Sequence, residues 1–260
     1  MEELLLPKGT AKNLLKNVEW QEGKIIPLME APYRYRIVTH CSSNGRQEAE
    51  FANGQHHYFC YMELIDGQGN WIKRGANIVP ILPDGRFIMV VEQRPPQGRY
   101  SNRSMIALIA NQEINLEQFG HYSSLEFPGG AVEKNEELKA GFLRELAEET
   151  GIENQTAIFF KRNQPIYGLG SDLAIQLFVG VVQLSGLSYK KRVDNDGGLI
   201  IFSLSRAEIE ENIKRGVICS GQAALMPWSF YKDIEKDIHS LNTTEEGEYF
   251  SKHLVKITKQ

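Results

Sequence analysis

Short runs of apolar residues, several of them alternating with polar ones, recur along the chain and predict β-strands. The runs that fit strands are residues 33–38, 57–62, 77–82, 87–91, 157–160, 175–182 and 199–204. Pro83-Asp84-Gly85 separates the third run from the fourth. A turn of this composition between two apolar runs predicts a β-hairpin.

Helical spacing of apolar residues is found in three places. The first follows Asn135, which we expect to be the N-cap, and ends at Gly151, a suitable C-cap glycine. Ser205 opens a predicted helix over residues 206–215, and residues 223–234 predict another that Pro227 interrupts. The stretch 95–123 is too long for an ordinary connection, so we interpret it as a functional insertion or as a further helix.

Strands and helices mixed in this order predict a mixed α/β (α+β) fold. The aromatic, β-rich runs before residue 72 have no helical pattern among them. We therefore expect two parts, a small β-rich N-terminal subdomain over residues 1–72 and a larger domain over residues 73–260.

Three carboxylates gather on the first predicted helix. Within GAVEKNEELKAGFLRELAEETGI, which begins at Gly130, they are Glu145, Glu148 and Glu149. Their spacing of i, i+3 and i+4 puts them on one helix face, where like charges repel. A bound cation would turn that repulsion into attraction, and Mg²⁺ or Mn²⁺ prefers such oxygen ligands. The alternative is a charged, solvated helix face.

The same segment fits the Nudix box, G-x5-E-x7-R-E-U-x-E-E-x-G-U with U aliphatic, at every fixed position, so the chain resembles the Nudix hydrolases. The resemblance implies an αβα sandwich in which the box holds Mg²⁺ or Mn²⁺ against a diphosphate. By this resemblance Glu145, Glu148 and Glu149 are metal ligands and candidate proton acceptors, and the Gly129 carbonyl is a further ligand. Arg144 would orient a box glutamate. Glu136, about 180° away from Glu145 on an ideal helix, would support the site rather than bind metal.

The implied reaction is hydrolysis of the pyrophosphate bond in a nucleoside diphosphate joined to another group. Glu92-Gln93-Arg94 and Glu126-Phe127-Pro128 resemble segments of the ADP-ribose and nucleoside-diphosphate-sugar pyrophosphatases. Arg94, Glu126 and Gly130 are therefore expected to bind substrate, with Arg94 clamping a phosphate or lying on the surface as a plain strand-end arginine.

The sequence departs from the pattern of those pyrophosphatases at two places, which leaves other functions as alternatives. Gly168 stands where those pyrophosphatases carry a proline after the box, and Tyr167 lies near a tyrosine position of dinucleoside polyphosphate hydrolases. Asp196 is the nearest residue to a distal glutamate that the chain lacks, and residues 194–198 also fit a simple turn. The alternatives are a dinucleoside polyphosphate hydrolase and a Nudix module that senses a nucleotide without cutting it.

Composition and charge limit the kinds of partner and the cellular location that we expect for this protein. A net charge of −4 gives no broad basic field, which argues against nucleic acid as a partner. The longest apolar runs are too short to span a membrane, and the first residues, MEELLLPKGT, lack the features of a secretory signal. Cys41, Cys60 and Cys219 suggest free thiols, so we expect a cytoplasmic protein. By the same resemblance, the N-terminal strands would help to form a homodimer.

Overall fold

The computed structural model describes residues 21–27, 35–41, 48–50, 56–58, 60–66, 68–94, 104–153, 158–162, 166–167, 175–184, 188–189, 199–240, 247–250 and 253–256. The chain divides into two compact units, one of residues 1–71 with 169–174 and the other of residues 72–168 with 175–260. The division into subdomains at residue 72 stays a prediction.

The first unit contains an antiparallel sheet in the order β1-β2-β5, and a separate antiparallel pair, β3 with β4. Their bounds are β1 Gln21–Pro27, β2 Tyr35–Cys41, β3 Glu48–Glu50, β4 His56–Tyr58 and β5 Cys60–Leu64. These strands overlap both runs predicted between residues 33 and 62, so the β-rich nature of this part is confirmed.

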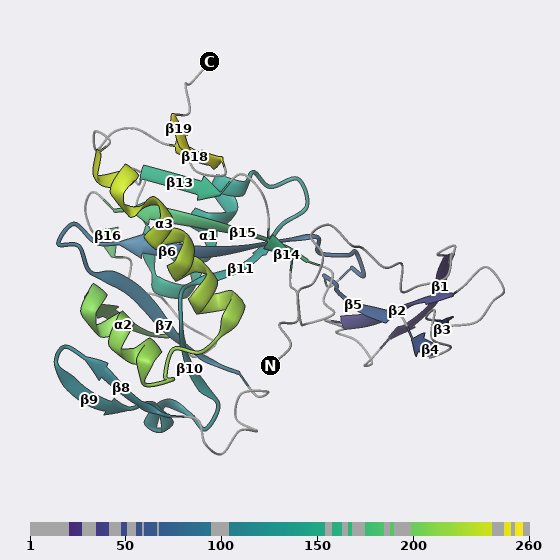
Figure 1. Cartoon of the computed structure of the whole chain (residues 1–260), viewed down its shortest axis with the longest axis horizontal. Coiled ribbons are helices and arrows are strands. Elements are labelled where there is room, and N and C mark those ends of the chain that lie inside the picture. The colour runs from purple at the N-terminus through teal and green to yellow at the C-terminus, as the bar shows by residue number, and fades with distance from the viewer. Residues whose placement is uncertain are drawn as a thin grey trace, which may run out of the picture. The chain divides into compact units, whose positions relative to one another are not determined.

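The second unit is built on a mixed sheet of ten described strands, whose main path is β10-β7-β6-β15-β13-β18-β19 (Figure 1). Those strands are β6 Arg74–Ile81, β7 Phe87–Gln93, β10 Ser123–Glu126, β13 Ile158–Arg162, β15 Gln176–Gln183, β18 Gly247–Phe250 and β19 His253–Lys256. Beside this path, β11 Gly129–Val132 pairs with β6, β14 Ile166–Tyr167 with β15, and β17 Ile200–Leu204 with β7. A separate small pair joins β12 Ile152–Glu153 to β16 Ser188–Tyr189.

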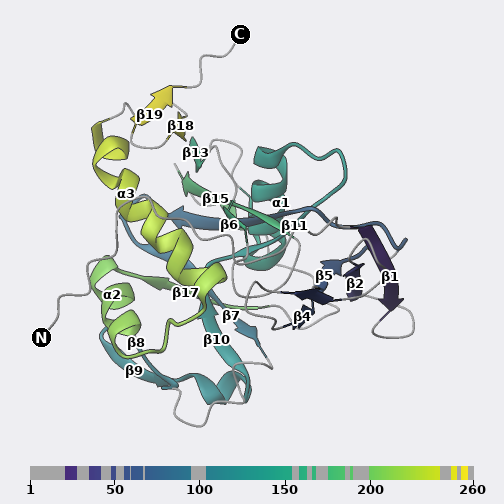
Figure 2. The same cartoon turned by 45° about the vertical axis from the view of Figure 1, so that its right-hand side comes forward.

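Helices cover both faces of this sheet (Figures 1 and 2). Alternate residues of a strand point to opposite faces, and β7 shows this clearly. Phe87, Met89 and Val91 pack in a cluster with α2 Arg206–Lys214 and α3 Met226–Ser240. Ile88 points the other way, into a cluster with α1 Leu138–Thr150. The three layers confirm the predicted αβα sandwich.

The predicted hairpin over residues 77–91 is only partly present. Gly85 forms its turn at a φ of 82°, in the left-handed region that glycine tolerates. Beyond the turn, β6 and β7 are paired only between Ile81 and Phe87. The two strands then diverge, because β6 pairs with β11 and β15 while β7 pairs with β10 and β17.

The described part of the insertion, residues 104–123, contains a hairpin and a short 3-10 helix rather than an α-helix. This part holds β8 Ile106–Ile109, β9 Gln112–Asn115 and the 3-10 helix, Leu116–Phe119. Ala110 and Asn111 form the turn with positive φ values of 51° and 59°. Asn212 of α2 fastens β8, since its side chain accepts a hydrogen bond from the Leu108 N–H and donates one to the Leu108 carbonyl, both at 2.8 Å.

The helix boundaries differ from the expectation at two points. Asn135 is not the N-cap of α1: it lies in the preceding turn at a φ of 68°, and Glu137 occupies the cap position without a side-chain hydrogen bond. Pro227 does not interrupt α3, because it is the helix's second residue, where a missing N–H costs nothing. A π-helical turn, Gly221–Leu225, comes directly before it.

Other helix signals are confirmed. Gly151 ends α1 in the left-handed conformation at a φ of 70°. Ser205 caps α2 in a complete capping box with Glu208. Gly141 allows α1 to approach the sheet closely, since a Cβ there would lie 3.3 Å from both Val132 methyl groups.

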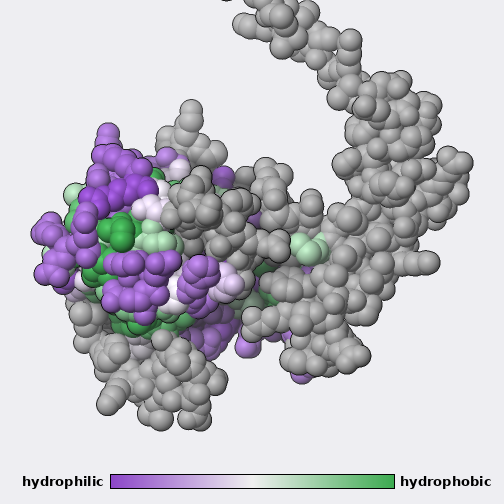
Figure 3. Space-filling model, turned by 90° about the horizontal axis from the view of Figure 1, so that it is seen from below, coloured by the Kyte–Doolittle hydropathy of each residue, from purple (hydrophilic) through white to green (hydrophobic). Residues whose placement is uncertain are grey.

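The surface of the described part is mixed in character. Figure 3 shows polar side chains beside smaller apolar areas on the face seen from below. Large apolar residues that are exposed in the described part are Ile106, Tyr122, Ile200 and Leu225. None of the described helices has the length and apolar character needed to cross a membrane.

Candidate active site

Two box glutamates of α1 meet the backbone that leads into β11. The Glu149 carboxylate accepts a hydrogen bond from the Gly129 N–H at 3.0 Å. The Glu145 carboxylate lies against Gly130, where an added Cβ would be only 2.3 Å from Oε2. A Cβ at Gly129 would meet the Ala76 carbonyl at 2.2 Å. A methyl group at Gly129 would collide with the β6 backbone, and one at Gly130 would displace the Glu145 carboxylate, so glycine at both positions allows this close packing.

Burial makes these two carboxylates costly to ionise. Desolvation raises the pKa of Glu149 to about 8, and the nearby charges of Glu92 and Glu145 add to the effect. Burial also raises the pKa of Glu145, against the opposing influence of Arg144. A cation placed among such oxygen atoms would offset their repulsion, which is the chemistry expected of a metal site.

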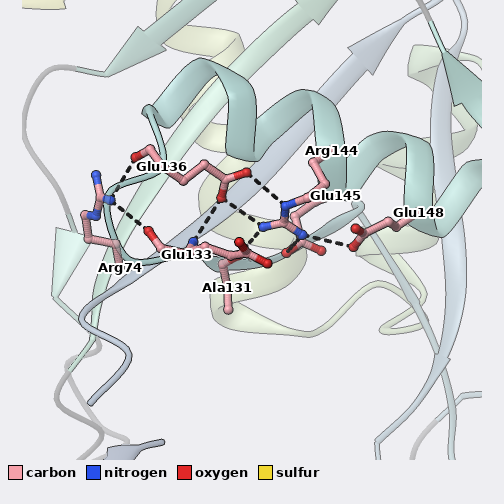
Figure 4. A network of polar contacts seen from close by, with 7 residues as sticks. All are labelled: Arg74, Ala131, Glu133, Glu136, Arg144, Glu145 and Glu148. Carbon is pink, nitrogen blue, oxygen red and sulfur yellow. Dashed lines mark hydrogen bonds and ion pairs between the residues drawn. The ribbon is translucent and has the colours of Figure 1, made fainter. Parts of the chain in front are cut away.

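Arg144 contacts three carboxylates and one backbone carbonyl (Figure 4). Its Nη1 bonds to Glu145 Oε1 and to Glu148 Oε2, both at 2.9 Å. Its Nε and Nη2 bond to the two oxygens of Glu136 at 2.9 and 3.0 Å, and Nη2 also donates to the Ala131 carbonyl at 2.7 Å. Hydrogen bonds from Arg144 lower the pKa of Glu136, the largest single influence on that carboxylate.

Glu136 and Glu148 thus differ from the two buried glutamates. Glu136 also accepts a hydrogen bond from the Glu133 N–H at 2.9 Å, so its carboxylate is shared between its own loop and Arg144. The Glu148 side chain is 55% exposed and contacts Arg144 on the surface of the helix. Glu136 as a support and Glu148 as a ligand both stay predictions, although this geometry is compatible with each.

Arg94 and Glu126 form the second part of the site. Glu126 is 1% exposed, and its Oε2 accepts hydrogen bonds from Arg94 Nε at 3.0 Å and Nη2 at 2.8 Å. Glu126 Oε1 is buried and has no hydrogen-bond partner among the described residues. Arg94 is therefore already committed to a carboxylate rather than presented as an unpaired phosphate clamp, and its phosphate-binding role stays a prediction.

Glu92 is a member of this group that the sequence reasoning did not assign a role. Its carboxylate forms an ion pair with Arg94, and its charge acts on Glu149. Residues 92 and 94 are two apart at the end of β7, a spacing that places side chains on the same side of an extended chain. Glu92 therefore acts on both parts of the site, through its ion pair with Arg94 and through its charge near Glu149.

Other residues without an assigned role hold the glycine segment in place. The Asn77 side chain donates from Nδ2 to the Gln222 carbonyl at 2.9 Å. The Phe127 N–H donates to the Ala223 carbonyl at 3.0 Å. The π-helical turn thus lies beside residues 126–130 on the side opposite α1. No local sequence pattern predicted this turn.

The donors fit a hard divalent cation in their chemistry, since every candidate ligand is an oxygen atom. Among the described residues, no three His, Cys, Asp or Glu side chains are gathered in an arrangement that could hold a metal ion. The Gly129 carbonyl, Glu145, Glu148 and Glu149 as a ligand set therefore stay a prediction. Asp194–Gly198, Pro165 and Gly168 lie outside the described residues.

Comparison with known proteins supports the family. The NUDIX domain model matches residues 71–169. Among solved structures, the chain is similar to a protein whose structure is described as "Crystal structure of ADP compounds hydrolase", with 14% identity and a TM-score of 0.54 over 85% of this chain and 98% of that one. At that identity the likeness establishes the fold alone. A search of curated proteins found no match to the chain. The domain match confirms the resemblance to the Nudix family over residues 71–169.

Proposed function

We propose that this chain, which carries a Nudix domain over residues 71–169, hydrolyses the pyrophosphate bond of a nucleoside diphosphate joined to another group. ADP-ribose or a sugar nucleotide is the proposed substrate, and a nucleoside monophosphate is released. The observation that carries the proposal is the convergence of Glu145 and Glu149 on the Gly129–Gly130 backbone. The similar solved structure, described as an ADP compounds hydrolase, supports the choice of substrate class.

Mg²⁺ or Mn²⁺ is the proposed cofactor, held by Glu145, Glu148, Glu149 and the carbonyl of Gly129. When bound, such a cation neutralises charge on the bridging oxygen and lowers the pKa of water. The chain's own part is to hold these donors on a rigid helix against a glycine backbone. The box glutamates are the proposed proton acceptors, and Glu149, which accepts a hydrogen bond from the Gly129 N–H, is the first of them to test.

Arg94 and Glu126 complete the proposed site as substrate-binding residues, with Gly130 giving close backbone access. Glu126 has a buried oxygen, Oε1, that can accept a hydrogen bond from a ligand hydroxyl or N–H group. A homodimer and a cytoplasmic location complete the proposal, and the dimer can be checked by light scattering.

The test is hydrolysis of a substrate panel by the purified full chain in Mg²⁺ and in Mn²⁺. The panel comprises ADP-ribose, sugar nucleotides, dinucleoside polyphosphates and nucleoside triphosphates. We expect turnover of at least one nucleoside diphosphate derivative, and a loss of about 100-fold or more in kcat for Glu149→Gln. Glu117→Gln is the matched control, because Glu117 is an exposed glutamate of the 3-10 helix outside the site.

Three results would redirect the proposal. Tight binding of a panel member without hydrolysis in either metal would favour the sensing module. Preference for dinucleoside polyphosphates would favour the other hydrolase class. Wild-type rates in a folded Glu149→Gln protein would show that the proton acceptor is wrongly assigned.

A further inference from the structure

Arg74 lies outside the box, at the start of β6, and contacts the loop that leads into α1. Its Nη2 donates to the Glu133 carbonyl at 3.1 Å and to the Glu136 carbonyl at 2.9 Å (Figure 4). We propose that Arg74 is a positioning residue, which fixes this loop so that Glu136 can hold Arg144 against the box glutamates. The inference rests on the proposed function for its effect on turnover, but not for its effect on the loop.

The loop is an irregular segment, so its position depends on contacts with the residues around it. Asn135 has a φ of 68°, a left-handed conformation that asparagine adopts more readily than most non-glycine residues. The helix then begins at Leu138, and its N-cap residue, Glu137, makes no side-chain capping hydrogen bond. Within the loop, the Glu136 N–H donates to the Glu133 carbonyl at 3.2 Å, and that same carbonyl also accepts from Arg74.

The donor, in contrast, lies on a well-supported strand. Arg74 is paired with Val132 of β11 on one side of β6 and with Gln176 of β15 on the other. Its guanidinium therefore projects from a fixed backbone toward two carbonyls of an irregular segment. Because a guanidinium is planar and rigid, two bonds from one nitrogen fix the separation of the two carbonyls.

The effect reaches the box through two side chains. The loop carries Glu136, whose carboxylate accepts two hydrogen bonds from Arg144. Arg144 in turn contacts Glu145 and Glu148 through Nη1. Displacement of the loop would turn the Arg144 guanidinium, and the proposed ligands bonded to it would turn as well. Arg74 contacts Glu136 through the backbone carbonyl of that residue, whereas Arg144 bonds to its carboxylate.

The experiment compares Arg74→Ala and Arg74→Lys with the wild-type chain. It measures Mn²⁺ affinity by electron paramagnetic resonance, amide exchange at residues 133–137, Tm, and kcat and KM for ADP-ribose. We expect Arg74→Ala to exchange faster in this loop, to bind Mn²⁺ about 10-fold more weakly and to lose kcat by a similar factor, while KM changes less than twofold. Arg74→Lys should recover part of the loss, since an ammonium group can also donate to two carbonyls but lacks the planar, rigid guanidinium.

Arg215→Ala is the control, because Arg215 forms two ion pairs, with Glu113 and Glu211, at the end of α2. It should leave Mn²⁺ affinity and loop exchange unchanged. Equal Mn²⁺ affinity and equal loop exchange in Arg74→Ala and wild type would overturn the inference. So would losses that follow Tm alone, with no recovery in Arg74→Lys. A wild-type chain that hydrolyses nothing would refute the proposed function only, because Mn²⁺ affinity and loop exchange still report on Arg74.

Discussion

Glu149 should make the metal-free protein less stable as the pH rises, although it is a central residue of the proposed site. Its ordinary pKa of 4.5 applies to the unfolded chain, while burial raises the folded value to about 8. Below pH 4.5 both states hold the proton and Glu149 has no effect on stability. Between pH 4.5 and 8 only the folded state holds it, so stability falls as the pH rises and becomes level above pH 8.

The size of the effect follows from those two values. At about 1.4 kcal/mol for each pH unit, the interval from 4.5 to 8 sets an upper limit of about 5 kcal/mol. Water that reaches the half-buried side chain reduces this, and we expect about 2 kcal/mol. Glu149→Gln removes the charge but keeps an oxygen that can accept the Gly129 hydrogen bond. The variant should therefore match the wild type near pH 4.5 and exceed its stability by about 2 kcal/mol at pH 8.5.

Urea denaturation in EDTA provides the assay, followed by circular dichroism and by tryptophan fluorescence at several pH values. Trp228 is 4% exposed in the core of the second unit, so its emission reports on that unit. Only the difference in unfolding free energy between variant and wild type is used, because the other titratable groups contribute equally to both proteins. Glu117→Gln serves as control and should give parallel curves. The reasoning would be refuted if the unfolding free energy of Glu149→Gln varied with pH in parallel with that of the wild type. A lower stability of the variant at pH 8.5 would refute it as well.

Added metal should reverse this order. A cation that binds only the folded wild type at about one hundred times its Kd stabilises it by about 2.7 kcal/mol, more than the advantage of about 2 kcal/mol that Glu149→Gln has without metal. The Glu149→Gln protein should lose most of that gain. An equal gain in both proteins would place the metal away from Glu149.

Three further changes test other parts of the structure. Asn212→Ala should lower the free energy of unfolding by about 2 to 3 kcal/mol, because it leaves the Leu108 N–H and carbonyl without their partner; a loss under 0.5 kcal/mol in urea denaturation would contradict this. Gly130→Ala should abolish hydrolysis, since the new methyl group would lie 2.3 Å from a Glu145 oxygen, and unchanged kcat would show that the carboxylate can move aside. Phe142→Ala should cost about 3 to 5 kcal/mol, since Phe142 is fully buried under the sheet, and a Tm unchanged in calorimetry would exclude that packing.

Much of the second unit could be predicted because its signals are local. The capping box at Ser205 and the glycine at 151 each depend on residues within one turn of a helix. The apolar run at 175–182 predicts β15 for the same reason, since both of its faces are buried. The signals for these elements lie within the elements themselves, so the sequence pattern is sufficient to predict them.

Features set by distant contacts were missed. Asn135 has the composition of an N-cap, but the loop that Arg74 fastens places it in a left-handed turn instead. The hairpin β8–β9 depends on Asn212, more than a hundred residues away in sequence. Pairing of β7 with β10 and β17 separates it from β6 after a turn that by itself favours a hairpin.

The candidate site likewise combines features set by local sequence with features set by distant contacts. The spacing of Glu145, Glu148 and Glu149 is a local property of one helix, and it identified the box without knowledge of the fold. The ionisation of these residues is not local. Glu149 owes its raised pKa to burial and to Glu92, which comes from a strand of the sheet. Sequence therefore specifies which groups are available for catalysis, whereas packing of α1 against the glycine backbone determines which of them can hold a proton near neutral pH.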